Sequence, residues 1–242
     1  PHSVVRDGAK IAFYEHGGGS QTILMVNPML YGLAMFQPVL EQLGQEFRII
    51  TLDPRGTGAS DPLPEQYSLR DHMEDVRAVI EEAGAAPIVG VGISRGGGLL
   101  VKLAVTYPGL VGRLVLVGTP TEFVPVPRMA EFSQALKSGD LEQAMRMFWP
   151  TVFSEPGTAA LVEQGVQHSL RLPSETVLSF FAQDPERKIA PVLDQVRVPT
   201  LVIHGTADRR VPFDDARYLA EHIPGARLYP FEGSDHLPLF TA

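Results

Sequence analysis

The residues best suited to nucleophilic chemistry lie in Gly92-Ile-Ser-Arg-Gly96, a Gly-x-Ser-x-Gly pattern that follows an apolar run and precedes a helix-like stretch. A sharp turn from strand to helix strains the central residue. Side chains two positions on either side would collide there, which explains the glycines. The pattern predicts that Ser94 is a nucleophile raised out of a sheet at a helix N-terminus. There, unpaired N–H groups and the helix dipole stabilise developing negative charge.

The chain has seven histidines, and His236 is the one whose position suits a general base. It lies in a loop after the last strand-like segment, from which an imidazole can face the turn that carries Ser94. Five of the others lie near termini, in turns or on helix faces, where we expect most to be solvated. The sixth, His204, lies at the end of an apolar strand. A buried structural hydrogen bond explains His204.

The acid that orients this base should follow a strand end and precede the histidine in the chain. Asp208 fits, because it comes after the apolar run 200–204 and a glycine turn. Its carboxylate would accept the second imidazole N–H, select the tautomer and stabilise the imidazolium. Asp235 is the competitor, but side chains of neighbouring residues in an extended loop point apart. We therefore expect Asp235 to be solvated or to brace the loop.

Short segments rich in Val, Ile and Leu must form the sheet that positions these side chains. Most are nearly continuous apolar runs, which is typical of parallel strands covered on both faces. Helical spacing of apolar residues lies between several of them, and this alternation predicts a mostly parallel sheet with flanking helices, an α/β fold. The expected strands are 10–15, 22–27, 47–52, 88–93, 114–118, 200–204 and 226–230, and the clearest helices are 69–83, 97–107 and 214–222.

One stretch interrupts the alternation, since residues 124–188 contain helical segments but no convincing strand. It predicts a helical cap over one edge of the sheet, inserted between core parts 1–123 and 189–242. Packing helices with no role beyond stability remain the alternative. The apolar cap side chains either line a substrate pocket or form the core of the cap; they are Phe132, Met145, Met147, Phe148, Trp149, Phe153, Phe180 and Phe181.

Composition excludes several classes of function. The formal net charge is −8, with no cluster of Lys and Arg, which argues against nucleic acid as a partner. The absence of cysteine excludes disulfides, thiolate zinc sites and a cysteine nucleophile. Apolar runs are strand-length, too short to cross a membrane. No basic region followed by an apolar stretch opens the sequence, so we expect no signal peptide and a cytoplasmic protein.

With these residues in place, the chain resembles the α/β-hydrolase superfamily from about Arg6 onward. The likeness also rests on Asp53-Pro-Arg55-Gly-Thr-Gly-Ala-Ser-Asp61, Gly205-Thr-Ala-Asp-Arg-Arg-Val-Pro212 and Gly233-Ser-Asp-His-Leu-Pro238. It is similar to hydrolase domains found ahead of bacterial adenylate-cyclase catalytic domains, and equally to free-standing small esterases. The resemblance implies an α/β-hydrolase fold with a helical cap. It also implies that the Asp and Arg of the first motif brace loops beneath the site.

Two departures from that superfamily matter. The usual His-Gly after the first central strand is Asn27-Pro28 here, and proline has no N–H to donate. The oxyanion hole should then use the backbone N–H groups of Met29 and Arg95. An Asn at this position is similar to 3-oxoadipate enol-lactonases, which favours lactone hydrolysis as an alternative. Members of the superfamily usually carry a final helix beyond the histidine, so the resemblance implies a trimmed chain.

The function predicted from these residues is cleavage of a carboxylic ester through an acyl-enzyme on Ser94. A lactonase, a C–C bond hydrolase or a cofactor-free haloperoxidase would use the same residues, and a weakly active regulatory or ligand-binding domain is a further alternative. A serine at position 94 argues against epoxide hydrolases and haloalkane dehalogenases, which need Asp there. No metal or cofactor is implied, because the triad itself supplies the nucleophile. The expected partner is a small ester or lactone, and a homodimer is left open.

Overall fold

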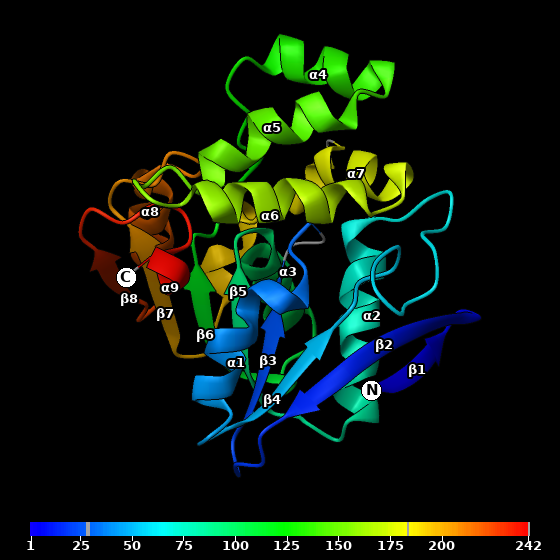
Figure 1. Cartoon of the computed structure of the whole chain (residues 1–242). Helices are drawn as coiled ribbons and strands as arrows, with labels where there is room; N and C mark the ends of the chain where they lie inside the picture. Colours follow the sequence, from blue (N-terminus) through cyan, green and yellow to red (C-terminus); the bar gives the residue numbers. More distant parts are fainter. Residues whose placement is uncertain (28–29, 183, 242) are drawn as a thin grey trace.

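The computed structural model describes residues 1–27, 30–182 and 184–241, which form one sheet of eight strands (Figure 1). The strand order is β1-β2-β4-β3-β5-β6-β7-β8. Strands β3 to β8 run parallel to one another, whereas β2 is antiparallel to both β1 and β4. The predicted mostly parallel sheet is confirmed. The strands are β1 His2–Arg6, β2 Ala9–His16, β3 Thr22–Val26, β4 Arg48–Leu52, β5 Ile88–Ile93, β6 Val111–Val117, β7 Thr200–Gly205 and β8 Arg227–Phe231.

Strand β1 was not predicted from the sequence. It is a mostly exposed edge strand, so it lacks the apolar run that marks the central strands. Asp7 and Gly8, with φ of 50° and 76°, form the two-residue turn that joins it to β2. Asp-Gly is a strong signal for this kind of hairpin turn, and reading it would have located β1.

Helices cover both faces of the sheet. Helices α2 (Leu69–Glu82), α3 (Arg95–Thr106) and α8 (Phe213–His222) pack on one face, in a core that they share with alternate side chains of β3 and β4. Helix α1 (Gln37–Leu43) packs on the opposite face. Burial of Met73, Val76, Val79 and Ile80 on α2 matches the helical spacing of its apolar residues.

Four helices, together called the cap, lie between β6 and β7, above the carboxyl ends of the parallel strands (Figure 1). They are α4 Met129–Ser138, α5 Leu141–Val152, α6 Ala159–Leu170 and α7 Ser174–Phe181. Two short turns of 3-10 helix, Pro185–Arg187 and Ala190–Gln195, lead the chain back to β7. A last short helix, α9 (Pro238–Thr241), follows β8. In the described part of the chain, no helix is long and apolar enough to cross a membrane.

The Asp-Pro-Arg motif after β4 forms a buried ionic brace. Arg55 donates two hydrogen bonds to the fully buried carboxylate of Asp75 on α2, at 2.9 and 2.8 Å. Asp53 accepts hydrogen bonds from the hydroxyl of Tyr14 and the backbone N–H of Ala59, at 2.7 and 2.9 Å. Both side chains therefore hold loops in place, as the resemblance implied.

Candidate active site

The turn between β5 and α3 carries Ser94 in a strained conformation, with φ of 50° and ψ of −121°. A Cβ atom on Gly92 would lie 2.4 Å from the Cα of Gly97, and one on Gly96 would lie 2.1 Å from the carbonyl oxygen of Val26. Any side chain at these two positions would force the turn open. The Ser94 N–H donates to the Val117 carbonyl at 2.7 Å, which ties the turn to β6.

A continuous chain of hydrogen bonds joins Ser94, His236 and Asp208. The Ser94 hydroxyl lies 3.1 Å from Nε2 of His236, and Nδ1 of the same ring lies 2.8 Å from Oδ2 of Asp208. Since a carboxylate only accepts, Nδ1 carries the hydrogen and Nε2 is free to accept from Ser94. The three side chains follow β5, β8 and β7, strands whose carboxyl ends meet at one edge of the sheet. The arrangement can deprotonate a serine as it attacks.

Asp208 is held as a carboxylate by four hydrogen-bond donors. Burial alone would raise its pKa, but the charge of His236 and hydrogen bonds from His204 and His236 hold that pKa well below its usual range. Its other oxygen accepts the backbone N–H groups of Arg210 and Val211 at 2.7 and 2.8 Å. The carboxylate can therefore stabilise a charge on the His236 ring at any pH near neutral.

His204 contacts the triad acid as well, a role that the sequence interpretation missed. Its Nε2 lies 2.9 Å from Oδ2 of Asp208 and 3.0 Å from the carbonyl oxygen of Val211, and the ring is fully buried. Both neighbours are acceptors, so this nitrogen donates, and Oδ2 of Asp208 receives hydrogen bonds from two imidazole rings. The signal available in the sequence was a histidine at the end of the strand that precedes Asp208, four residues ahead of this acid.

Asp235 braces the loop, one of the two roles expected for it, and is buried rather than solvated. Its Oδ1 accepts the backbone N–H of His236 at 2.8 Å, and its Oδ2 accepts the backbone N–H of Ser154 in the cap. Its own N–H donates to Glu155 at 2.7 Å. The loop that carries His236 is thus fastened to the cap, and the Asp235 carboxylate bonds backbone N–H groups rather than the His236 ring.

Of the two expected oxyanion donors, only Arg95 lies among the described residues. The backbone N–H of Arg95 occupies the first position of α3, where no intrahelical acceptor exists. Pro28 and Met29 lie outside the described residues. The flanking Asn27, at the end of β3, donates from its side-chain amide to the Tyr31 carbonyl.

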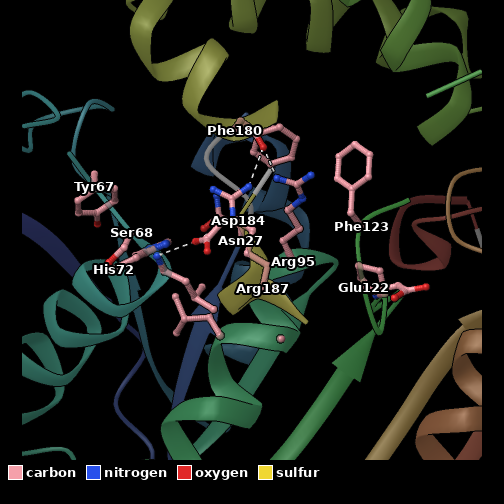
Figure 2. A pocket seen from close by; sticks show the side chains of 15 residues that line it. Asn27, Tyr67, Ser68, His72, Arg95, Glu122, Phe123, Phe180, Asp184 and Arg187 are labelled. Carbon is pink, nitrogen blue, oxygen red and sulfur yellow. Dashed lines mark hydrogen bonds and ion pairs between the residues drawn. The ribbon is translucent and has the colours of Figure 1, made fainter. Parts of the chain in front are cut away.

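A pocket opens beside the turn, between α2, α3 and the cap (Figure 2). Its lining includes Asn27, His72, Arg95, Phe123, Phe180 and Arg187. Ser94 is nearly buried and is not among the lining residues, but its chain neighbours Arg95 and Gly96 are. The pocket therefore adjoins the nucleophile along the α3 N-terminus.

The apolar cap residues divide between the two roles open to them. Phe180 lines this pocket, whereas Phe132, Phe148 and Trp149 are buried in the core of the cap. His72 belongs to the group of histidines of which most were expected to be solvated; it faces the pocket, and burial lowers its pKa to about 4. No group of three or more His, Asp or Glu side chains in the described ranges could hold a metal ion.

Comparison with known proteins gives a consistent fold and several chemistries. A family profile described as "alpha/beta hydrolase fold" matches residues 14–242. The 2-hydroxy-6-oxononadienedioate/2-hydroxy-6-oxononatrienedioate hydrolase of Escherichia coli (strain K12 / DH10B) is 28% identical over 94% of this chain and 84% of its own length. The enol-lactonase from Burkholderia xenovorans LB400 superimposes with a TM-score of 0.88 at 21% identity, covering 99% of this chain and 94% of that one. Esterase RhEst1 from Rhodococcus sp. ECU1013 superimposes with a TM-score of 0.85 at 23% identity, covering 98% and 92%.

Proposed function

The chain belongs to the alpha/beta hydrolase fold family, and from that premise we propose that it hydrolyses carboxylic esters through an acyl-enzyme on Ser94. The observation that carries the proposal is the hydrogen-bonded chain from Ser94 through His236 to Asp208. A serine hydroxyl alone is a weak nucleophile. A base within hydrogen-bond reach, itself oriented by a third group, is what activates it.

The proposed reaction has two halves. The Ser94 oxygen attacks the ester carbonyl carbon while Nε2 of His236 takes the hydroxyl proton. The tetrahedral intermediate then expels the alkoxide, which receives that proton and leaves as the alcohol. Water attacks the acyl-enzyme with His236 again as base, and the carboxylic acid and the Ser94 hydroxyl are regenerated. Asp208 stabilises the imidazolium in both halves.

Negative charge develops on the carbonyl oxygen in both tetrahedral intermediates. The proposed donors are the backbone N–H groups of Arg95 and Met29. Each preorganised donor of this kind lowers the barrier by about 3–4 kcal/mol. The positive end of α3 points at the same place, because Arg95 is the first residue of that helix.

A second candidate is hydrolysis of a C–C bond next to a carbonyl, or of a lactone. The relative that is 28% identical carries the name of a dienedioate hydrolase, and the same three side chains could attack a ketone carbonyl. Asn27 at the end of β3 favours the lactone, because the sequence there is similar to that of enol-lactonases. Both alternatives keep Ser94 as the attacking group and differ in the bond that breaks.

The test is turnover of p-nitrophenyl acetate by the parent chain, by Ser94→Ala and by Ser174→Ala, which removes an exposed serine hydroxyl from α7. We expect the first variant to lose activity without a change in melting temperature and the second to match the parent. An organophosphonate should label Ser94 covalently. Equal activity in Ser94→Ala and the parent would overturn the proposal. Turnover of a 2-hydroxy-6-oxo-dienoate or an enol-lactone, but not of simple esters, would favour the second candidate.

A further inference from the structure

The side chain of Arg95 enters the pocket beside the nucleophile, a position unrelated to the backbone N–H discussed above. One guanidinium nitrogen, Nη1, donates to the Phe180 carbonyl, and the guanidinium carbon lies 4.4 Å from the centroid of the Phe180 ring (Figure 2). The Phe123 ring lies on another side, at 5.9 Å. Within residues 1–27, 30–182 and 184–241, no carboxylate comes within ion-pair distance of Arg95. Its charge is therefore held between aromatic rings without a counter-ion.

Further positive charge surrounds it. Burial, together with the charges of Arg187 and Arg210, lowers the pKa of Arg95 to about 9, so the group remains protonated at neutral pH. Arg187 donates to the same Phe180 carbonyl at 2.9 Å, and Figure 2 shows the two guanidinium groups converging there. Two cations thus share one neutral acceptor.

The acidic side chains of the pocket are already engaged. Glu122 pairs with Lys188 at 3.1 Å. Asp184 accepts the backbone N–H groups of Leu69 and Glu186, and lies 3.8 Å from Nε of Arg187. Neither carboxylate neutralises Arg95. Once these carboxylates are matched with Lys188 and Arg187, the charge of Arg95 is left without a counter-ion, on a protein whose net charge is −8.

A merely structural role does not explain this arginine. Closing the end of α7 needs N–H donors for its last carbonyl groups, and Arg187 already supplies them to Ser179, Phe180 and Ala182. A half-buried cation without a counter-ion is costly, and an anion arriving in the pocket would remove that cost. A guanidinium presents its N–H groups in a plane that matches the two oxygens of a carboxylate.

We propose that Arg95 binds a carboxylate carried by the substrate, so that the favoured substrates are anionic esters. This rests on the proposed ester hydrolysis at Ser94 and names its substrate class. Arg187 strengthens the positive potential of the pocket without being the principal contact. The acid group would lie on the α7 side of the pocket while the scissile carbonyl lies at the start of α3.

The experiment compares substrates that differ only in charge. The 4-nitrophenyl half-esters of succinate, glutarate and adipate are paired with the 4-nitrophenyl esters of 4-methylpentanoate, 5-methylhexanoate and 6-methylheptanoate. In these esters an isopropyl group replaces the carboxylate. A second pair, 3-carboxyphenyl acetate and 3-isopropylphenyl acetate, places the charge on the alcohol side. Ser94→Ala protein gives the background, which matters because a neighbouring carboxylate can hydrolyse its own ester.

We expect kcat/KM of the parent to favour at least one charged ester over its neutral partner by tenfold or more. Arg95→Met should lower kcat/KM for that charged ester by roughly 10- to 100-fold, mainly through KM, as expected for loss of a hydrogen-bonded ion contact. The loss for the neutral partner should be much smaller, and Arg95→Lys should restore part of the preference. Arg146→Gln removes an equal charge from the exposed side of the cap, where Glu142 and Glu163 bind it, and should leave the preference unchanged.

Equal losses for charged and neutral esters in Arg95→Met would mean that Arg95 only supports the cap, and would overturn the inference. A neutral preference of the parent in every pair would do the same. If no ester is hydrolysed at all, the proposed function fails, and a binding measurement decides the inference separately. Calorimetry of glutarate should then show binding to the parent that weakens at least tenfold in Arg95→Met. No difference between the two proteins would reject the carboxylate site.

Discussion

At the scale of single residues, one carboxylate oxygen of Asp208 receives N–H groups from two imidazole rings. A triad needs one such contact, from the base. The second comes from His204, which cannot reach the substrate because it is fully buried behind the acid. We interpret His204 as a positioning residue: it fixes the carboxylate and favours its charged form.

The first prediction concerns this contact. His204→Leu removes the donor, so the pKa of Asp208 should rise and kcat should fall by roughly tenfold, in line with loss of a hydrogen bond to a charged group. Because the folded-state pKa of Asp208 lies below its ordinary value, the parent keeps the carboxylate ionised above about pH 4. The acid limb of kcat/KM reports protonation of the general base, so the check is a direct titration. The carboxyl carbon of Asp208, followed by NMR, should titrate at a higher pH in the variant than in the parent. His204→Gln, which keeps a donor, is the control; an Asp208 carboxyl that titrates at the same pH in His204→Leu as in the parent would contradict the assignment.

The second prediction concerns His72, whose Nε2 has no hydrogen-bond partner among the described residues. Burial lowers its pKa to about 4, so below about pH 6.5 the unfolded chain binds a proton that the folded protein does not. Stability should therefore fall as the pH drops from about 6.5 to 4, by up to about 3 kcal/mol from this residue. Denaturant unfolding across this range should show a shallower decline for His72→Gln. The exposed His222→Gln serves as control, and identical slopes for parent and His72→Gln would contradict the prediction.

At the scale of elements, the cap depends on close contact between α5 and α6. Trp149 on α5 lies fully buried against Gly165 on α6, and its indole N–H donates to the Ser169 hydroxyl at 3.0 Å. A Cβ atom at position 165 would lie 2.3 Å from the Trp149 ring. The glycine is there because the indole occupies the space of a side chain.

The third prediction follows from that contact. Gly165→Ala should force the two helices apart and destabilise the protein by about 1–3 kcal/mol, the usual cost of overpacking. For a chain of this size the melting temperature should fall by roughly 2–10 °C. Gly18→Ala is the matched control, since a Cβ there meets nothing within 4 Å. A melting temperature for Gly165→Ala equal to that of the control would show that the α5–α6 contact is loose.

At the scale of the whole molecule, the loop carrying His236 is fastened both to the core and to the cap. The hydrogen bond from His236 to Asp208 connects this loop to the turn after β7. The hydrogen bond from the Ser154 N–H to Asp235 connects it to the chain just after α5. The two carboxylates lie in different loops, Asp208 after β7 and Asp235 after β8, and they serve different purposes. One acts on the ring of His236 and the other on its backbone.

The fourth prediction separates the role of Asp208 from that of Asp235. Asp208→Asn should lower kcat by several orders of magnitude, about 10⁴-fold in a well-studied triad, because an amide can donate to the imidazole and select the wrong tautomer. Asp235→Asn should affect kcat far less but lower the melting temperature, since its amide nitrogen would meet N–H donors from Ser154 or His236. Steady-state kinetics and thermal unfolding of both variants provide the check. The reverse order of kcat values would assign the acid to Asp235.

By itself, the sequence determined the features that depend on neighbours in the chain. The glycines around Ser94 follow from the geometry of one turn, and the parallel strands follow from continuous apolar runs. Such strands end at one edge of the sheet, so the sequence alone predicted that Ser94, Asp208 and His236 would lie close together. Their catalytic roles stay a prediction. An exposed edge strand such as β1 has no apolar run and was missed.

Only the tertiary structure decided which distant groups meet. His204 and Asp208 are near in sequence, yet only the turn of the chain after β7 brings the His204 ring to the Asp208 carboxylate. The meeting of Arg95 with Arg187 at the Phe180 carbonyl depends on how α7 lies over α3. Residue types reveal which groups can donate or accept, but the packing of helices against the sheet determines whether a partner lies within hydrogen-bond distance. For this reason the nucleophile could be found in the sequence, whereas the unpaired charge beside it could not.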